Sequence, residues 1–575
     1  MDTIPQILFE AYRDAPDRTA ITLLFSDRPE VELNYRDLVH FSAGYASSLA
    51  ESGVARGNVV ILILDHGADL VCAFFGTILH GAIPAIMPFL TEKLSTKQYR
   101  ASLTELFAIT SPRAVITYPE FVPEVQAAIE NANHTGLFAP MVLSSDQVST
   151  ARSIKWDELG GMDRSSNDIV LLQHSSGTTG LQKGVALSHQ AVIRQIENYA
   201  PVLELSQDDV IVSWLPLYHD MGLIAGFIMP VLARARLVLM SPFDWVRGPY
   251  RLMQAISEYR GTLCWMPNFA YNFCARKIRD RELEGVNLSS LRAVINCSEP
   301  MHWSSHQMFL ERFQPYGLSP QALATCYAMA ENVFAVTQGG INGPIKEDMI
   351  DRQAFSNRQV AAPIDGGLHE GSMLRMLSAG NPINNTEVRV IDSSGNELPE
   401  RHVGEISLQS NCMLSGYYNR PDATEKAFID GWYLTGDLGY QADGELYITG
   451  RVKDLIIVGG KNVYPQDLER LVEDVDGVHH GRVVAFGVFN ENTGTEDVVV
   501  IAEVDLELEG KGIPCMSDPA SSEGKIAAQI RQRITQGSEI ALRYVCVVGR
   551  NWLLKTSSGK VARSANREKY LSEMG

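Results

Sequence analysis

The sequence predicts an α/β protein with a large N-terminal domain of layered α/β sheets, a β-rich subdomain and a small α+β C-terminal domain. Up to about residue 380, short apolar runs alternate with helical patterns, which is typical of buried sheets covered by helices. Closely spaced strands with turn signals follow from Glu387. A second mixed pattern of strands and helices begins beyond Arg451. These three successive patterns predict the three parts of the architecture.

The strands expected in the large domain are short runs rich in branched apolar side chains, at residues 59–64, 114–118, 168–173, 210–215, 237–240, 263–266 and 293–297. Residues 70–90 are as apolar as a membrane-spanning helix, because their only clearly polar side chains are Thr77 and His80. Glycines and prolines at 76, 81, 84 and 88 interrupt this run. We therefore predict a buried helix over about 70–80, a buried strand around 83–87 and no transmembrane segment.

In the β-rich subdomain we expect strands at 387–392, 404–409 and 445–449. Beyond it we expect strands at 455–458, 483–488, 498–504 and 544–548, with helices from about 466 and near 523–535. The predicted division is residues 1–451 for the N-terminal domain, with its subdomain at about 380–451, and 454–575 for the C-terminal domain. An insertion at about 340–378 lacks periodicity, and a connection of this length is either functional, packed by itself or a tolerated surface loop.

Composition excludes several classes of protein. The 575 residues contain 49 Lys and Arg against 68 Asp and Glu, a net charge of −19, so no overall cationic surface is available to bind nucleic acid. The eight cysteines form no C-x-x-C pair and no zinc-type cluster, which predicts reduced thiols. The N-terminus lacks a basic, then apolar, secretory signal. We therefore expect a cytoplasmic protein.

The strongest chemical signal follows the expected strand at 168–173. Glycines there permit exposed backbone N–H groups, hydroxyls donate hydrogen bonds and Lys183 adds a positive charge, as polyphosphate binding requires. Lys183 does not follow the Walker spacing. A plain Ser/Thr/Gly turn is the alternative. The candidate phosphate-binding residues are Ser175, Ser176, Gly177, Thr178, Thr179, Gly180 and Lys183.

This loop resembles the phosphate loop of the adenylate-forming superfamily, which includes acyl-CoA synthetases, luciferases and nonribosomal-peptide adenylation domains. Four further segments resemble that family's motifs in the same order along the chain: Tyr327-Ala328-Met329-Ala330-Glu331, Tyr433-Leu434-Thr435-Gly436-Asp437, Gly450-Arg451-Val452-Lys453-Asp454 and the run from Lys555 to Arg563. The resemblance implies a two-domain enzyme that uses ATP and Mg²⁺ to activate a carboxylate.

The resemblance also implies roles for individual residues. Lys560 would act on the carboxylate and the α-phosphate, and Glu331 would bind Mg²⁺ together with Thr178. A solvated basic tail is the alternative for Lys560. Lys453 would be the hinge of a mobile C-terminal lid, with an exposed linker as the alternative. The remaining nucleotide contacts would come from Ser298, Glu299 and Pro300 beside the adenine and from Tyr327, Ala328 and Met329 along its face. Asp437 would contact the ribose, and Arg451 the ribose or a phosphate.

Two positions depart from the family pattern. Ala328 replaces the usual glycine and Ala330 the usual threonine, which puts one backbone approach and one hydroxyl contact in doubt. Asp437 could instead cap its turn, and Ser298 with Glu299 could cap the turn that follows them. His174 stands where the family has an aromatic residue, and we assign it no catalytic role.

Three segments resemble the fatty-acyl-AMP ligase branch: residues 214–224, residues 266–271, and Asn462-Val463-Tyr464-Pro465-Gln466-Asp467-Leu468-Glu469, where Val463 replaces a histidine. The insertion also falls where that branch carries one. His219 could gate the carboxylate entrance, a catalytic role, or be satisfied structurally. The usual F-D-x-S form of amino-acid-activating domains is missing near residue 214, although Asp220 keeps that option open.

The predicted function is therefore that of a fatty-acyl-AMP ligase. A fatty acid and ATP would give acyl-adenylate and pyrophosphate, and the acyl group would pass to the phosphopantetheine thiol of an acyl carrier protein acting in trans. The alternatives are an acyl-CoA synthetase and, because of Ala328 and Ala330, a catalytically inactive nucleotide-binding regulator. The chain length of the fatty acid and the oligomeric state stay open.

Overall fold

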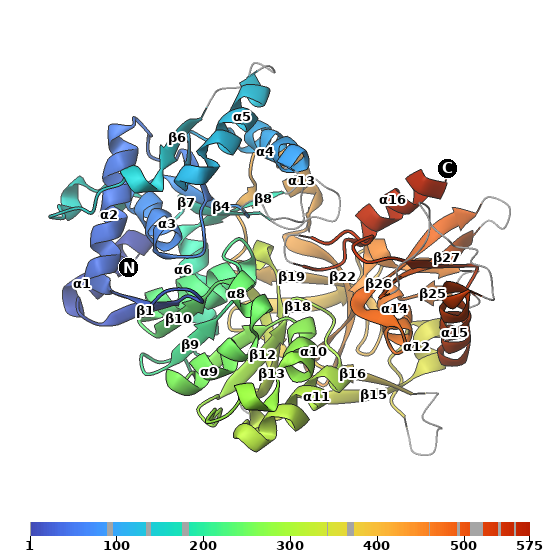
Figure 1. Ribbon diagram of the computed structural model, residues 1–575. Coiled ribbons are helices and arrows are strands. Elements are labelled where there is room, and N and C mark those ends of the chain that lie inside the picture. Colours follow the sequence, from blue (N-terminus) through green and yellow to red (C-terminus); the bar gives the residue numbers. More distant parts are fainter. Residues whose placement is uncertain are drawn as a thin grey trace.

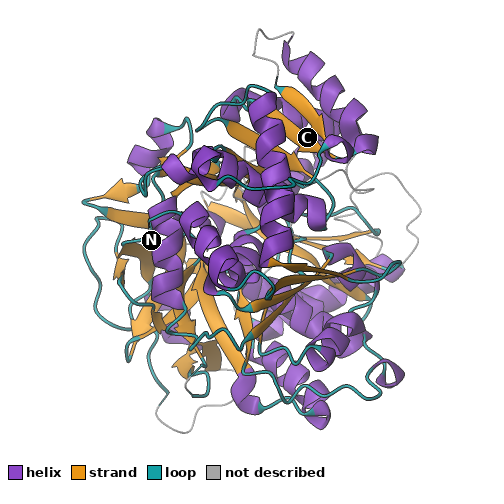
Figure 2. Cartoon of the chain, turned by 90° about the vertical axis from the view of Figure 1, so that its left-hand side faces the viewer, coloured by secondary structure: helices purple, strands orange, loops and turns teal. Residues whose placement is uncertain are grey.

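The computed structural model describes residues 2–88, 96–133, 140–174, 183–341, 343–364, 373–458, 461–490, 495–505, 521–538, 542–556 and 559–574. Figure 1 shows the N-terminal sheets and helices on one side and the C-terminal strands and helices on the other. Helices and sheets alternate in layers, so the predicted α/β class is confirmed. Turning the chain by 90° shows helices packed over the sheets (Figure 2).

A nine-stranded sheet forms the centre of the large lobe, in the order β17-β14-β13-β12-β11-β9-β10-β1-β2. The strands from β13 to β1 are parallel, and antiparallel strands complete both edges. Both faces of this sheet contribute to one apolar core. Its strands are β1 (Thr19–Leu24), β2 (Val31–Asn34), β9 (Val210–Ser213), β10 (Arg236–Met240), β11 (Leu263–Met266), β12 (Ala293–Cys297), β13 (Leu323–Ala328), β14 (Ala335–Gly339) and β17 (Asn381–Pro382).

Two smaller sheets lie N-terminal to most of these strands. A four-stranded parallel sheet has the order β4-β3-β5-β6, with strands β3 (Val59–Ile63), β4 (Ile83–Ile86), β5 (Ala114–Thr117) and β6 (Met141–Ser144). A three-stranded sheet joins β7 (Ile169–His174), β8 (Gly184–Ser188) and β20 (Gly416–Tyr417). The pairing of β8 with β20 brings a segment from beyond residue 410 beside the candidate phosphate loop.

Helices cover these sheets on both sides. The predicted helix over about 70–80 is α3, and no helix among the described residues is long and apolar enough to cross a membrane. The cytoplasmic location stays a prediction. The other helices of this part are α1 (Ile4–Asp14), α2 (Tyr35–Glu51), α3 (Ala68–His80), α4 (Thr96–Thr110), α5 (Val122–Asn133), α6 (His189–Tyr199), α7 (Met229–Ala233), α8 (Pro242–Arg247), α9 (Tyr250–Glu258), α10 (Asn268–Lys277) and α11 (Trp303–Phe313).

The predicted β-rich subdomain is a five-stranded antiparallel sheet. Strand β23 pairs with β22, and the others follow the order β18-β19-β22-β21. The bounds are β18 (Thr386–Ile391), β19 (Gly404–Ser410), β21 (Phe428–Ile429), β22 (Trp432–Ala442) and β23 (Glu445–Arg451), and α13 spans Pro421–Lys426. All three strands expected here from turn spacing are present.

The insertion carries its own secondary structure. Strands β15 (Glu347–Asp351) and β16 (Met373–Leu377) pair in antiparallel fashion, and helix α12 (Arg352–Arg358) follows β15. Phe355 and Leu374 pack in one apolar cluster with Tyr440 of β22 and with Tyr464. The described parts of the insertion, residues 343–364 and 373–378, are therefore packed against the fold.

The C-terminal part has a separate apolar cluster made only of residues from Ile456 onward. Its elements are β24 (Ile456–Val458), β25 (Lys461–Val463), α14 (Pro465–Glu473), β26 (Val478–Asn490), β27 (Thr495–Val504), α15 (Ser522–Gly537), β28 (Tyr544–Val548) and α16 (Arg563–Met574). Every strand and helix expected here is present. The boundary at 451–454 itself stays a prediction.

The cysteines depart in part from the expectation of reduced thiols. Six are free and buried: Cys72, Cys264, Cys274, Cys297, Cys326 and Cys412. Cys546 is disulfide-bonded, so the expectation is wrong for Cys546, and Cys515 lies outside the described residues.

Candidate active site

The candidate site lies at the carboxyl ends of neighbouring parallel strands of the nine-stranded sheet. His219 and Asp220 come after β9, Ser298 comes directly after β12, and Glu331 comes after β13. Since β13, β12, β11 and β9 are neighbours and parallel, these ends meet at one edge of the sheet, the usual place for a ligand in an α/β fold. The sequence motifs therefore converge in space.

Lys560 reaches this edge from the C-terminal part. Its Nζ donates a hydrogen bond to the backbone carbonyl oxygen of Ser298. The Ser298 residue has a φ of +70°, a left-handed conformation that few non-glycine residues adopt. This conformation marks a specialised turn immediately after β12.

Two carboxylates lie around the Lys560 ammonium. Burial raises the pKa of Glu299, and the charge of Lys560 opposes this shift. At Asp220 burial also acts to raise the pKa, but the contacts with His219 and the charge of Lys560 outweigh it, so the pKa of Asp220 is lowered. Lys560 therefore provides a positive charge among acidic groups, as condensation of two anions requires.

His219 is paired with its neighbour. Its Nδ1 lies 2.7 Å from Asp220 Oδ1, and both side chains are mostly buried. The backbone N–H of Met221 donates to Asp220 Oδ1 at 2.7 Å and begins a buried π-helix, Met221–Ile228. Such helices occur often at functional sites. The arrangement gives His219 a structural partner, and its role as a gate stays a prediction.

A second group surrounds Asp437 in β22. Tyr327 Oη donates to Asp437 Oδ2 at 2.7 Å, and Arg451 Nε donates to Asp437 Oδ1 at 3.0 Å. The charge of Asp437 raises the pKa of Arg451. A carboxylate has about four lone-pair positions, so Asp437 can still accept two hydroxyl groups. Three residues from three separate motifs thus meet here.

Glu331 accepts a hydrogen bond from Tyr417, a residue that the sequence analysis missed. Tyr417 Oη donates to Glu331 Oε1 at 2.8 Å and lies 3.0 Å from Tyr433 Oη. Lys183 Nζ lies 4.4 Å from the centre of the Tyr417 ring, a cation–π contact. Burial raises the pKa of Glu331, and the Tyr417 hydrogen bond opposes that shift. Only the pairing of β20 with β8 reveals that Tyr417 belongs to this site.

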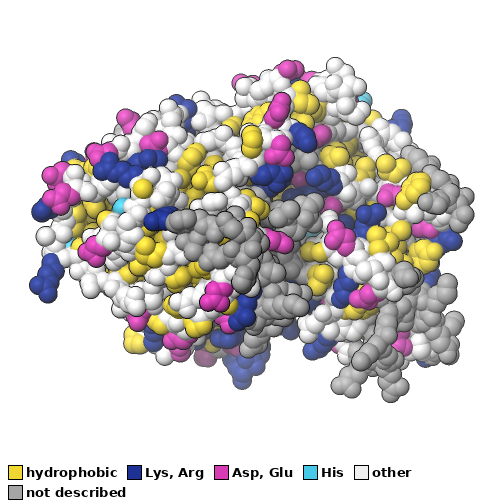
Figure 3. Space-filling model, turned by 90° about the horizontal axis from the view of Figure 1, so that it is seen from above, with side chains coloured by type: hydrophobic (Ala, Val, Ile, Leu, Met, Phe, Trp, Pro, Cys, Tyr) yellow, Lys and Arg dark blue, Asp and Glu magenta, His cyan; other side chains and the backbone are white. Residues whose placement is uncertain are grey.

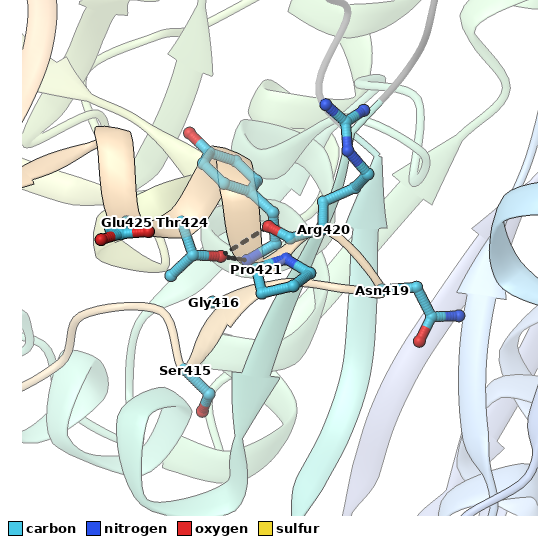
Figure 4. A pocket seen from close by; sticks show the side chains of 8 residues that line it. Ser415, Gly416, Asn419, Arg420, Pro421, Thr424 and Glu425 are labelled. Carbon is cyan, nitrogen blue, oxygen red and sulfur yellow. Dashed lines mark hydrogen bonds between the residues drawn. The ribbon is translucent and has the colours of Figure 1, made fainter.

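In addition to the pairing of β20 with β8, the side chain of Thr424 holds the segment that presents Tyr417. Thr424 Oγ1 accepts from Tyr417 N at 2.9 Å and donates to the Arg420 carbonyl oxygen at 3.0 Å (Figure 4). A cavity of about 580 Å³ borders this turn, with Tyr417 in its wall beside Ser415, Gly416, Asn419, Arg420, Pro421, Thr424 and Glu425. The turn therefore sets the orientation of Tyr417 toward Glu331.

The other predicted residues lie as follows. Met329 N donates to Phe334 O at 2.8 Å after Ala328 ends β13, and Pro300 is exposed beyond Glu299. Lys453 is exposed in the short turn Val452–Asp454. Six predicted phosphate contacts, Ser175, Ser176, Gly177, Thr178, Thr179 and Gly180, lie outside the described residues. His174, just before them, is buried with both ring nitrogens unpartnered, and burial lowers its pKa to about 4.

Comparisons with known proteins agree with this geometry. The family model described as "AMP-binding enzyme" matches residues 8–418. The chain is 30% identical over 598 residues to the long-chain-fatty-acid–AMP ligase FadD26 of Mycobacterium bovis, covering 99% of this chain and 97% of that protein. It is 29% identical over 570 residues to the medium-chain-fatty-acid–acyl-carrier-protein ligase JamA of Moorena producens, covering 96% and 92%.

A solved structure from studies of fatty acyl-adenylate ligases of E. coli and L. pneumophila is also similar, with a TM-score of 0.86 and 26% identity. It covers 100% of this chain and 98% of that one. The two chains thus share the adenylate-forming ligase fold over their whole length, with a large N-terminal and a smaller C-terminal domain. The motifs gathered at the sheet edge, the matching family model and the relatives of equal length lead to one conclusion: the chain belongs to the AMP-binding enzyme family and is an adenylate-forming ligase.

Proposed function

We propose that this chain is a fatty-acyl-AMP ligase that passes its acyl group to an acyl carrier protein. The observation that carries the proposal is the placement of Lys560 among Ser298, Asp220 and Glu299. The names of FadD26 and JamA support a fatty acid as substrate, and that of JamA supports a carrier protein as acceptor.

In the proposed mechanism, Tyr327 lies along the adenine, while Asp437 accepts the ribose hydroxyls and is oriented by Arg451. Lys183 contacts the phosphates. The Lys560 ammonium lies between the fatty carboxylate and the α-phosphate and offsets the repulsion between these two anions. A carboxylate oxygen then attacks the α-phosphorus, the bond to pyrophosphate breaks, and an acyl-adenylate forms.

The second half-reaction replaces AMP by a thioester. The phosphopantetheine sulfur attacks the acyl carbonyl carbon, the bond to AMP breaks, and the thiol proton leaves to solvent or to AMP. We propose that Lys453 is the pivot about which residues 454–575 turn as a lid so that this thiol can approach. The exposure of Lys453 in a short turn supports this role.

Magnesium fits the residues at the site. The described residues contain no group of three or more His, Cys, Asp or Glu side chains that could hold a metal ion, whereas Mg²⁺ bound to nucleotides takes one or two carboxylates with phosphates and water. Glu331, with Thr178, would hold the ion, which would offset phosphate charge. The Tyr417 hydrogen bond orients the Glu331 carboxylate.

We propose that the insertion favours a carrier protein over free CoA by restraining the lid. Arg352 Nη1 donates to the Gly537 carbonyl oxygen at 3.3 Å, and the rings of Phe355 and Tyr464 lie 5.3 Å apart. Both contacts join α12 to the C-terminal part. An acyl-CoA synthetase is the competing assignment, and it predicts equal transfer to CoA.

ATP–pyrophosphate exchange with carboxylates of graded chain length tests the first step. We expect exchange that depends on a fatty acid and peaks at one range of chain length. No exchange with any carboxylate would contradict the proposal and favour a nucleotide-binding regulator. Acyl transfer from the same enzyme to a phosphopantetheinylated carrier and to CoA then separates the two acceptors.

A further inference from the structure

The loop that carries Lys560 is a small hairpin attached to α16. Lys555 and Val561 form an antiparallel bridge, and Thr556 N donates to the Lys560 carbonyl oxygen at 2.7 Å. At its base, Leu554 N donates to Asn566 Oδ1 and Asn566 Nδ2 donates to the Leu554 carbonyl oxygen, both at 2.8 Å. These bonds make the hairpin and α16 one unit, but they do not by themselves position that unit in the C-terminal part.

Arg563, three residues after Lys560, joins this unit to the rest of the C-terminal part. Its Nη2 donates to both carboxylate oxygens of Glu469 in α14, each at 2.9 Å. Its Nη1 donates to Asp454 Oδ2, and its Nε donates to the Ala485 carbonyl oxygen of β26 at 3.0 Å. One guanidinium thus contacts three separate elements.

The environment makes these contacts strong. The side chains of Arg563, Asp454 and Glu469 are exposed by only 20%, 13% and 17%. Partly buried hydrogen bonds between charged groups are stronger than neutral ones, and removal of one partner leaves a desolvated charge. A planar guanidinium can satisfy the two carboxylates and the carbonyl together, whereas a lysine ammonium cannot reproduce that fork.

The bond between Arg563 and Asp454 lies directly beside the proposed pivot. Asp454 directly follows Lys453, the proposed pivot, and it ends the short turn Val452–Asp454. Through Arg563, the residue directly after the proposed pivot is bonded to the segment that presents Lys560. Rotation at the pivot and movement of the Lys560 hairpin are therefore mechanically coupled.

We propose that Arg563 is a positioning residue that joins the hairpin of Lys560 to the exit of the hinge, so that everything from Asp454 to α16 turns as one body. This inference rests on the proposed function, since Lys560 is the group being positioned. It confines the flexible part of the hinge to residues N-terminal of Asp454. Arg563 acts through Lys560 and touches no reacting atom.

A double-mutant cycle tests the coupling. In Arg563→Lys we expect the rate of acyl-adenylate formation to fall roughly 10- to 100-fold, because a displacement of about 1 Å typically costs about 10²-fold. The KM for ATP should stay within about twofold, since ground-state binding is unaffected. When Lys560 is already alanine, the same substitution should cost less than about twofold, because residues that act as a unit are not additive.

The matched control is Arg567→Ala, one turn along α16, where an exposed arginine donates through Nε to the Gly487 carbonyl oxygen. It should leave the rate unchanged. Asp454→Asn is the milder variant, because it keeps both hydrogen bonds between Arg563 and Glu469. It removes only the negative charge of Asp454 that faces Arg563. An unchanged rate in folded Arg563→Lys and Asp454→Asn, or a fully additive loss in the double variant, would overturn the proposal.

Hydrogen exchange gives a readout that does not need activity. In Arg563→Lys, backbone amides in 552–562 and 452–456 should exchange faster, while those of α15 keep their wild-type rate. Equal exchange in all these segments would overturn the proposal even if the enzyme is active. If wild type forms no acyl-adenylate but exchange changes as expected, the proposed function fails and the mechanical link stands.

Discussion

At the scale of single residues, the site consists of charged groups whose partners come from distant motifs. Lys560 meets the Ser298 carbonyl oxygen across 262 positions of the chain, and Tyr327 meets Asp437 across 110. Each contact therefore joins residues that are far apart in the sequence and meet only in the folded chain. Two substitutions test the resulting roles.

Lys560→Ala should reduce the rate of acyl-adenylate formation by about 10²–10³-fold, the typical loss for one donor that stabilises transition-state charge. Pyrophosphate release with a fatty acid as co-substrate measures this rate. The control is Lys525→Ala, an exposed lysine on α15. Acyl-adenylate formation at the wild-type rate in Lys560→Ala would remove this residue from the mechanism.

Asp437→Asn should raise the KM for ATP by about 10-fold or more, because a hydrogen bond to a charged group contributes about 1.5–3 kcal/mol. The substitution keeps the shape of the side chain but removes the charge that orients Arg451. Asp443→Asn, an exposed aspartate in the turn after β22, should leave the KM unchanged. Equal KM values in both variants would show that Asp437 only caps its turn.

At the scale of elements, the insertion packs against the C-terminal part, and we expect these contacts to restrain the proposed lid. Helix α12 contacts the C-terminal part through Arg352 and Phe355, while β15 is anchored by Asp348, which accepts from Tyr440 and Arg401 at 2.9 Å each. The insertion therefore contacts both the β-rich subdomain and the C-terminal part. Loss of these contacts should change the choice of acceptor.

Shortening the insertion should raise acyl-CoA formation while acyl-adenylate formation persists. Because a large deletion uncovers the buried ring of Tyr440, Arg352→Ala is the milder test, since it removes only the bond to Gly537 and to the Met373 carbonyl oxygen. Arg358→Ala, an exposed position on the same helix, is the control. Thioester yields with CoA and with a carrier protein measure the effect, and unchanged CoA use in both folded variants would contradict a role as acceptor filter.

At the scale of the whole molecule, buried histidines link stability to pH. Burial lowers the pKa of His174, His189 and His306 to about 4, from an ordinary value of 6.5. These rings stay neutral in the folded protein, but the unfolded chain takes up their protons as the pH falls below 6.5. Their stabilising effect is therefore complete above pH 6.5 and is lost as the pH falls toward 4.

We expect the free energy of unfolding to decrease between pH 6.5 and 4.5, by about 1.4 kcal/mol per pH unit for each such histidine. Chemical denaturation across this range measures the slope. His174→Phe should reduce the slope, because it removes one of these titrating rings. The variant should still fold, since neither nitrogen of the His174 ring makes a hydrogen bond that would be lost. His479→Asn, at an exposed position, should not change it, and equal slopes in all three proteins would contradict the assignment.

Net charge also acts at this scale. Figure 3 shows basic side chains distributed among acidic ones over the described part of one face. With a net charge of −19, we expect recognition of anionic partners to depend on local basic groups rather than on the whole surface. The sequence alone was sufficient for that conclusion, because composition does not depend on how the chain folds.

The sequence by itself predicted most of the strands and the residues that carry the candidate chemistry. Strands β11, β12 and β28 begin and end at the predicted residues, because alternation and apolar runs are local properties of the chain. The motifs likewise identified Lys560, Asp437 and Glu331 as candidate site residues. Local sequence patterns were sufficient for both the strand bounds and the candidate residues.

Only the tertiary structure decided which groups meet. The contacts of Tyr417 with Glu331 and of Arg563 with Glu469 and Asp454 join segments separated by 86, 94 and 109 positions. The packing of α12 against the C-terminal part was equally hidden, because a seven-residue helix shows too little periodicity to predict. Such contacts depend on strand pairing and domain packing over the whole chain, which no local pattern encodes.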